Sequence, residues 1–285
     1  MLATDDEGHH RWAFGTGFVD PLEGIDTRVP AGVEPDALSR YCLALGDDAL
    51  VYSHRLQEWI TRLPELEEET AVANIALDLL GQARMLLSRA GRARPELGDE
   101  DRLAFLRVEN EFRNVRLVEA ADADFAELVV RLLIFATWRL ALFERLAGSA
   151  DPVLAAIAAK GANEVRYHRE YAAGWVVRLG DGTAESRRRT AAALQRWEPL
   201  VEELFGPDAI TAALPGTAVD PATVRAEVEL SLAAVLATAT LERPDVPPLG
   251  PVSGGYGRDG AHTESLGHAL AVLQAVARQN PGATW

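Results

Sequence analysis

The chain has 285 residues, of which 43 are acidic and 28 basic, giving a formal net charge of −15. This length allows one large domain or two small ones, and the acidic balance argues against a nucleic-acid ligand, because proteins that bind phosphate backbones concentrate Lys and Arg. No apolar run approaches the roughly 18 residues that a membrane-spanning helix needs, and the acidic start lacks the features of a secretory signal, so we expect a cytoplasmic protein.

Residues 1–34 mix Gly, Pro and charged residues without periodicity, which predicts an extended N-terminal arm. The next two segments, 34–63 and 64–91, each place apolar residues three and four apart, the period of an amphipathic helix. A break at Pro64 separates them. We therefore expect an antiparallel helical hairpin whose second helix ends at Gly91.

Further helical patterns follow the hairpin, and no run alternates apolar and polar residues over the length of a strand. The stretch 243–262 is rich in Pro and Gly and is predicted to be a long surface connection. Residues 35–285 are thus predicted to form one all-α domain, a bundle of long antiparallel helices with additional helices toward the C-terminus. The expected later helices cover residues 99–119, 122–147, 152–180, 184–205, 221–242 and 262–279.

His168 is the residue that raises the question of metal chemistry. It lies in the apolar stripe of segment 152–180, so its imidazole is predicted to point into the bundle. In carboxylate-bridged di-iron bundles, two helices each supply a Glu-x-x-His pair and two others supply one acid each, because residues three apart share a helix face. Here the position three before His168 is Val165, which cannot bind a metal. The single cysteine, Cys42, also excludes a cysteine-based zinc site.

The predicted hairpin carries two acids at similar heights, Asp48 and Asp78. Three residues beyond Asp78, where a histidine would complete the second motif, stands Gly81. Two acids and one imidazole fall short of a di-iron ligand set, and the alternative is a mononuclear site formed by Asp48, Asp78 and His168. The favoured interpretation is that the acids pair with Arg84 or with Tyr and Trp donors, while His168 is hydrogen-bonded in a core without metal.

Three other pairs have spacings that suit metal binding. They are Glu7 with His10, Glu164 with His168, and Glu264 with His268. The first pair is the only literal Glu-x-x-His, but it lies in the N-terminal arm, so we do not expect it to supply ligands in the core. The other two pairs lack a third ligand, and we expect each to be a contact on a helix surface. The basic run 187–189 is predicted to be a solvated helix face.

Five stretches resemble the C-subunit family of the bacterial phenylacetyl-CoA epoxidase. The resemblance covers roughly residues 38–285, and LDLLGQAR and VRYHREYAAGWVVRLGDG are its most specific parts. The five stretches are LGDDALVYSHRLQEW, ANIALDLLGQARMLL, NEVRYHREYAAGWVVRLGDGT, RWEPLVEELF and NPGATW.

This resemblance implies a ferritin-like fold and a role in the multicomponent monooxygenase of aerobic phenylacetate degradation. In that family the A subunit keeps the di-iron ligands, and the C subunit is its structural partner. The resemblance therefore implies that the chain has no catalytic residue, cofactor or metal of its own, and that it assembles with the A subunit and other epoxidase components. The vestigial ligand positions would be Asp48, Asp78, Gly81, Val165 and His168.

Alternatives remain open at this point. One is a metal-dependent oxygenase with a divergent mono- or di-iron site, and another is ferritin-like iron storage. When alone, the chain is also a candidate for a homodimer. Candidate partner surfaces are the wide apolar arc of the helix at 65–91 and the aromatic side chain of Trp138, and core packing explains both features equally well.

Overall fold

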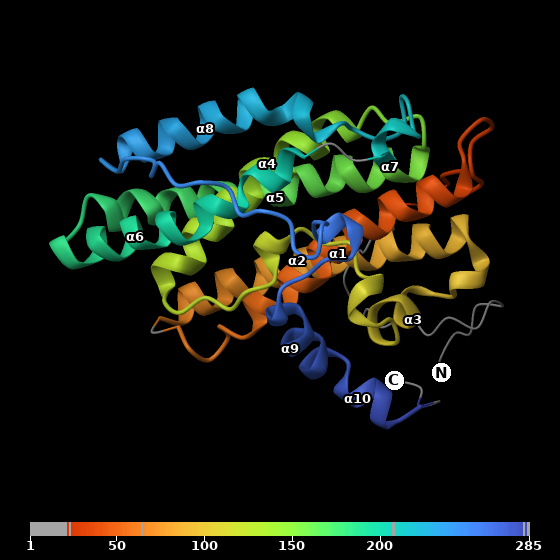
Figure 1. The fold of residues 1–285 in the computed structure, drawn as a ribbon, viewed down its shortest axis with the longest axis horizontal. Coiled ribbons are helices and arrows are strands. Elements are labelled where there is room, and N and C mark those ends of the chain that lie inside the picture. The colour runs from red at the N-terminus through yellow and green to blue at the C-terminus, as the bar shows by residue number, and fades with distance from the viewer. Residues whose placement is uncertain (1–21, 23, 64, 207–208, 282, 284–285) are drawn as a thin grey trace, which may run out of the picture.

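The computed structural model describes residues 22, 24–63, 65–206, 209–281 and 283. Regular structure in this part of the chain is helical, and extended backbone pairs only in an isolated bridge between Val252 and Gly255. The predicted all-α, ferritin-like architecture is confirmed (Figure 1).

The α-helices are α1 (Pro35–Gln57), α2 (Leu66–Ala93), α3 (Glu100–Phe105), α4 (Phe125–Leu146), α5 (Pro152–Gly180), α6 (Ala184–Trp197), α7 (Ala209–Ala212), α8 (Arg225–Thr238), α9 (Glu264–Leu273) and α10 (Ala275–Gln279). Short 3₁₀ turns lie between them at η1 (Pro95–Leu97), η2 (Glu109–Glu111), η3 (Arg116–Val118), η4 (Glu198–Leu200), η5 (Glu202–Phe205), η6 (Pro221–Val224) and η7 (Gly257–Asp259).

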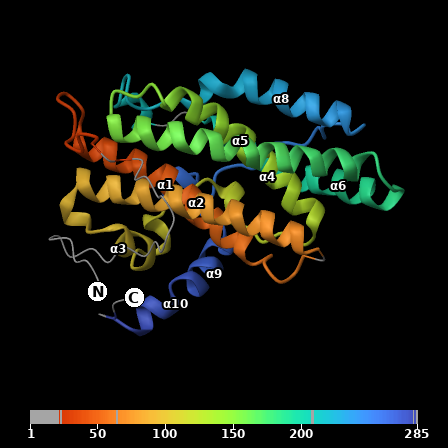
Figure 2. The ribbon, with the colours of Figure 1, turned by 180° about the vertical axis from the view of Figure 1, so that it is seen from behind.

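Four long helices, α1, α2, α4 and α5, form a bundle. α1 runs antiparallel to α2. Two hydrogen bonds show this orientation: Ser39 Oγ donates to the Ala90 carbonyl (3.1 Å), and Ser53 Oγ donates to the Ala76 carbonyl (2.6 Å). α4 pairs with α5, and α2 packs against α5, so that α2 and α5 run across the molecule when it is viewed from behind (Figure 2). Among the described residues, the helices lack the combination of length and apolar character that crossing a lipid bilayer demands.

Local sequence signals fix where the long helices begin. The Asp124 carboxylate accepts from Glu127 N (3.0 Å) at the start of α4, and the Asp151 carboxylate accepts from Leu154 N (2.8 Å) at the start of α5, where Pro152 occupies the first turn. Such N-caps satisfy backbone donors that have no partner inside the helix. The predicted starts at 122 and 152 are therefore correct to within a few residues.

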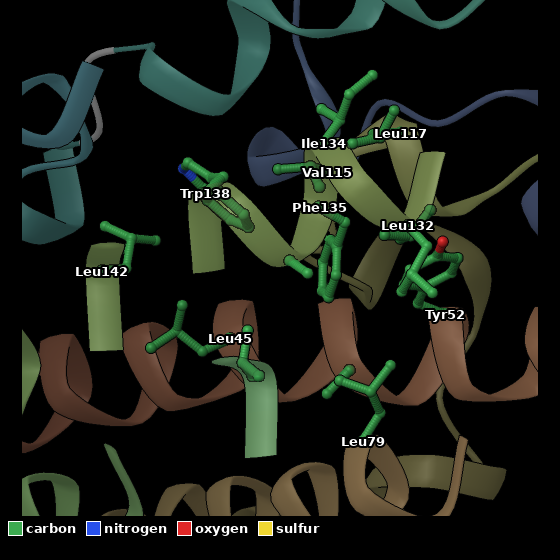
Figure 3. Close-up of a cluster of buried hydrophobic side chains, with 14 of the residues drawn as sticks. Leu45, Tyr52, Leu79, Val115, Leu117, Leu132, Ile134, Phe135, Trp138 and Leu142 are labelled. Carbon is green, nitrogen blue, oxygen red and sulfur yellow. The ribbon is translucent and has the colours of Figure 1, made fainter. Parts of the chain in front are cut away.

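The apolar core joins the two helical hairpins. The Tyr52 ring of α1 meets the Phe135 ring of α4 edge-on, with centroids 4.7 Å apart. Figure 3 shows Phe135 at the centre of this cluster, with Leu79 of α2 on one side and Leu132 beside Tyr52. Trp138 is 1% exposed and donates through Nε1 to the Leu204 carbonyl (2.9 Å). Trp138 thus belongs to the core, so of its two interpretations core packing holds and partner surface does not.

The predicted end of α2 is correct to within two residues, but the helix predicted after it is wrong. α2 continues through Gly91 to Ala93, and a Cβ at Gly91 would lie 2.2 Å from the Gly98 carbonyl oxygen, so this glycine permits a close contact between backbone segments rather than ending the helix. The helix predicted over 99–119 stops at Phe105. Its later residues form short turns instead of a continuous helix.

The predicted surface connection at 243–262 is a loop whose residues are mostly exposed or part-exposed, and it is fixed to the bundle at two buried points. A Cβ at Gly257 would lie 2.1 Å from the Asn114 carbonyl oxygen, so the loop packs closely against the segment that follows α3. His262 is buried, and its ring Nδ1 lies 2.7 Å from a Glu119 carboxylate oxygen. Composition therefore predicts the loop correctly but not these two buried contacts.

The described part of the N-terminal arm contacts the bundle. Arg89 of α2 is buried and donates to the Thr27 carbonyl (2.5 Å). Residues 1–21 lie outside the described residues, so the predicted extended arm stays a prediction.

A pair of glycine substitutions in α5 tests the close packing of α4 on α5. A Cβ at Gly161 would lie 2.5 Å from Phe143 Cε2, whereas a Cβ at Gly174 would meet nothing within 4 Å. Gly161→Ala is expected to lower the free energy of unfolding by about 1–3 kcal/mol through overpacking. Gly174→Ala is expected to raise it by about 0.5–1 kcal/mol, because alanine is the better helix former. Urea unfolding followed by circular dichroism measures both, and equal effects would contradict the packing.

Candidate functional site

Asp78 of α2 and His168 of α5 meet inside the bundle. His168 Nε2 lies 3.0 Å from Asp78 Oδ2, a hydrogen-bond distance. His168 is 1% exposed, whereas the Asp78 side chain is 37% exposed and reaches solvent. The structure therefore brings together two of the sequence-predicted positions, one acid and one imidazole.

Asp48 is buried among different partners. Its carboxylate accepts from Val115 N (2.8 Å) and from the Arg258 guanidinium (2.7 and 3.0 Å). Asp78 contacts α5 instead, so the two aspartates serve separate contacts. The predicted pairing of these acids with Arg84 is wrong, because the Arg84 side chain is largely exposed and its Nε lies 3.3 Å from Oε1 of Glu100, the first residue of α3.

The two other positions of the predicted motifs carry no donor atom. Val165 is completely buried in the core. Gly81 faces open space, since a Cβ there would meet nothing within 4 Å. Glu164, four residues before His168, contacts Lys160 and Gln82 rather than the imidazole. Glu7 and His10 lie outside the described residues.

The bundle centre holds an arginine that the sequence interpretation missed. Arg139 of α4 is fully buried, and its Nε donates to Gln82 Oε1 (2.9 Å) on α2. Its Nη1 donates to the Leu45 carbonyl (3.3 Å) on α1. Gln82 in turn donates to Glu164 Oε2 (2.9 Å) on α5, so one polar chain links all four helices of the bundle.

This guanidinium carries its charge in an apolar environment. Its carbon Cζ lies 4.4 Å from the Phe143 ring centroid, and its Nη2 has no hydrogen-bond partner among the described residues. Burial lowers the pKa of Arg139 from its usual value to about 10. Because the folded-state pKa lies below the unfolded one, the charge costs stability at pH values below about 10, and this cost disappears as the pH rises from there toward the unfolded-state pKa.

The residues present do not fit a di-iron centre. Such a centre takes acids from four helices and histidines from two, whereas the described residues contain no group of three or more His, Cys, Asp and Glu side chains that suits a metal ion. A fixed guanidinium in the bundle centre also repels cations across a medium of low dielectric constant. Arg139 is visible in the sequence as a charge within the apolar run LLIFATWRLALF, which is the signal that could have found it.

The sequence profile of the phenylacetic acid catabolic proteins matches residues 26–285. The chain belongs to this family. It is 46% identical over 250 residues to the 1,2-phenylacetyl-CoA epoxidase C subunit of Escherichia coli (strain K12), and the match covers 87% of this chain and 99% of that protein. The resemblance seen in the sequence blocks is confirmed.

In this phenylacetic acid catabolic protein the basic run on α6 contacts neighbours of its own chain. Arg188 and Arg189 are half to two-thirds exposed and both pair with Glu185. Arg187 donates to the hydroxyl and the carbonyl of Thr240. These contacts fit the expected solvated helix face.

Iron content is the first test of the centre. The isolated chain, grown in iron-replete medium and purified without chelator, is expected to carry less than about a tenth of an iron per chain, because Asp78 and His168 alone are too few ligands. Elemental analysis measures this value. Stoichiometric iron that is lost in an Asp78→Ala/His168→Ala variant would contradict the prediction.

A double-mutant cycle tests the Arg139–Gln82 contact. Gln82→Leu is expected to lower the free energy of unfolding by about 1.5–3 kcal/mol, because it leaves the buried guanidinium without its side-chain acceptor. Adding Arg139→Met removes the unpaired charge and is expected to restore most of that loss. Urea unfolding measures the free energy of unfolding of each variant in the cycle. The control is Gln195→Leu on the exposed side of α6, whose free energy of unfolding is expected to stay within about 0.5 kcal/mol of the parent. Additive losses in the double variant would contradict the coupling.

Proposed function

We propose that this chain is a non-catalytic structural subunit of a phenylacetyl-CoA epoxidase and that it holds the catalytic di-iron subunit in the assembly. The observation that carries the proposal is the 46% identity to an epoxidase C subunit along 99% of that protein. A relative matched over its whole length suggests the same role in the same kind of complex. Work within a cytoplasmic monooxygenase also fits a chain whose described helices include none that suits a membrane span.

The bundle centre supports a structural rather than a catalytic role. Oxygen activation by this type of bundle depends on iron held by acids and histidines from four helices. Here Val165 and Gly81 supply no ligand, and Arg139 supplies a positive charge. These features argue against both a divergent oxygenase and iron storage.

A structural subunit must bury surface against its partner, and permanent interfaces of this kind are large and apolar. Leu77 and Leu80 of α2 are 60% and 39% exposed, and Tyr167 of α5 is 52% exposed. These side chains lie on the two helices that run across the view from behind (Figure 2). We infer that this α2–α5 face contributes to the contact with the catalytic subunit.

Co-expression tests the proposed assembly. Tagged catalytic A subunit from the same organism is expected to retain this chain at a one-to-one ratio. The pair, given reductase, a reduced electron donor, oxygen and phenylacetyl-CoA, is expected to form the ring epoxide and water. This chain with the reductase alone is expected to form none. Epoxide formed without the A subunit would overturn the proposal.

Variants locate the contact. Leu77→Asp/Leu80→Asp is expected to reduce co-purification at least tenfold, because it places charges in a desolvated apolar contact. Val272→Asp on α9, a similarly exposed apolar position, serves as the control. If only the Val272→Asp control loses co-purification with the A subunit, the contact lies on another face of the chain and the proposed subunit role still holds.

A further inference from the structure

A large cavity lies on the side of α1 away from the Asp78–His168 pair. It has a volume of about 790 Å³, within the range of small-molecule sites. Its wall combines α1 with the segment after α3, the chain around α7 and the loop before η7. We call it the α1 cavity, and it plays no part in the proposed function.

One wall of the α1 cavity is rich in guanidinium groups. Five arginines line it, and they are Arg40, Arg94, Arg107, Arg113 and Arg258. Arg40 and Arg94 share a single carboxylate, that of Asp36, and Arg94 also pairs with Glu96. Arg107 is held by Asp47, and Arg258 by Asp48. On a chain with a formal net charge of −15, a group of five arginines at one place needs a reason.

Arg113 is the member of this group without an ion pair. Its Nη1 donates to the carbonyl oxygens of Asn110 (2.7 Å) and Phe112 (2.6 Å), and no carboxylate oxygen among the described residues lies within 4 Å of its guanidinium. Half-burial is the main cause that lowers the pKa of Arg113, and the nearby charges of Arg107 and Arg40 lower it further, against the opposing effects of Asp47 and Asp259. An anion bound beside Arg113 would offset the repulsion from Arg107 and Arg40.

The carboxylates of the cavity wall are already engaged. Glu202 pairs with Arg225 and Glu203 with Arg116, both outside the arginine wall. Glu111 and Asp259 accept from backbone N–H groups of Val108 and Tyr256. They are therefore held in place by other partners, and among the described residues Arg113 is the arginine of this wall whose guanidinium pairs with no carboxylate.

The remaining wall is apolar. Leu45 of α1 lies below Trp138 and Leu142 of α4 in Figure 3, and all three line the α1 cavity. Leu103 and Ile210 add apolar surface from α3 and α7. A ligand that fills this space needs an apolar body as well as an anionic end.

We propose that the α1 cavity binds a small organic oxyanion, a carboxylate or a phosphate ester with an apolar body, whose oxygens accept from Arg113 and Arg40. Arg113 supplies charge-assisted hydrogen bonds, and the leucine and tryptophan side chains cover the apolar body. The neutral analogue of such a ligand lacks the anion and binds far more weakly.

Isothermal titration calorimetry of the full chain at low ionic strength tests this site. The probes are 3-phenylpropionate, benzyl phosphate, benzyl alcohol and inorganic phosphate. At least one of the two oxyanions with an aromatic body is expected to bind with a Kd below about 1 mM, and benzyl alcohol is not. Preference for 3-phenylpropionate identifies a carboxylate ligand, and preference for benzyl phosphate identifies a phosphate ester. No binding of either, or inorganic phosphate binding as tightly as benzyl phosphate, overturns the proposal.

Arginine variants distinguish binding in the α1 cavity from a general effect of the protein's positive charges on anion binding. Arg113→Met is expected to weaken binding at least tenfold, the loss typical of a hydrogen bond to a charged group. Arg92→Met, an exposed arginine of α2 outside the cavity, is expected to leave Kd unchanged. If circular dichroism shows that Arg113→Met does not fold, Arg40→Met replaces it with the same expectation, since the Arg40 side chain is 60% exposed. Unchanged binding in the folded variant overturns the proposal.

Discussion

Two adjacent carboxylates in the middle of α1, Asp47 and Asp48, hold the non-helical parts of the molecule to the bundle. Both are completely buried. Asp47 accepts from Arg107 and from the backbone of Arg113, and Asp48 accepts from the backbone of Val115 and from Arg258. Because a buried charge that loses its partner costs about 3–5 kcal/mol, these contacts fix the path of the segment after α3 and of the C-terminal loop. That path in turn forms a wall of the α1 cavity.

The bundle centre carries a polar network that differs from the ligand set of a di-iron fold. In a di-iron bundle, the cations neutralise acids that converge from four helices. Here Arg139 provides one fixed positive charge, and Gln82 and Glu164 relay hydrogen bonds from it across the bundle. The polar chain specifies how the helices align, while its cation opposes metal binding. This arrangement agrees with the proposed structural role beside a catalytic relative.

Local periodicity predicted the long helices well because burial of one apolar face dominates their energetics. It failed at 99–119, where the backbone of Arg113 and Val115 donates to Asp47 and Asp48 instead of continuing a helix. The candidate site was predictable only in part. Motif spacing identified Asp78 and His168 but not Arg139. A charge in an apolar run marks a buried residue, and its role becomes visible only when its partners on other helices are known.

The all-α class, the order of the long helices, the family and the lack of ligand atoms at Gly81 and Val165 can all be seen in the amino-acid sequence. These follow from residue identity and from spacing along one helix, which are local properties. The pairing of Asp48 with Arg258, the position of Arg139 in the bundle centre and the five arginines that line one cavity are visible only in the folded chain. Each of these joins residues far apart in the chain. The energy of such contacts depends on burial and distance, which no single segment encodes.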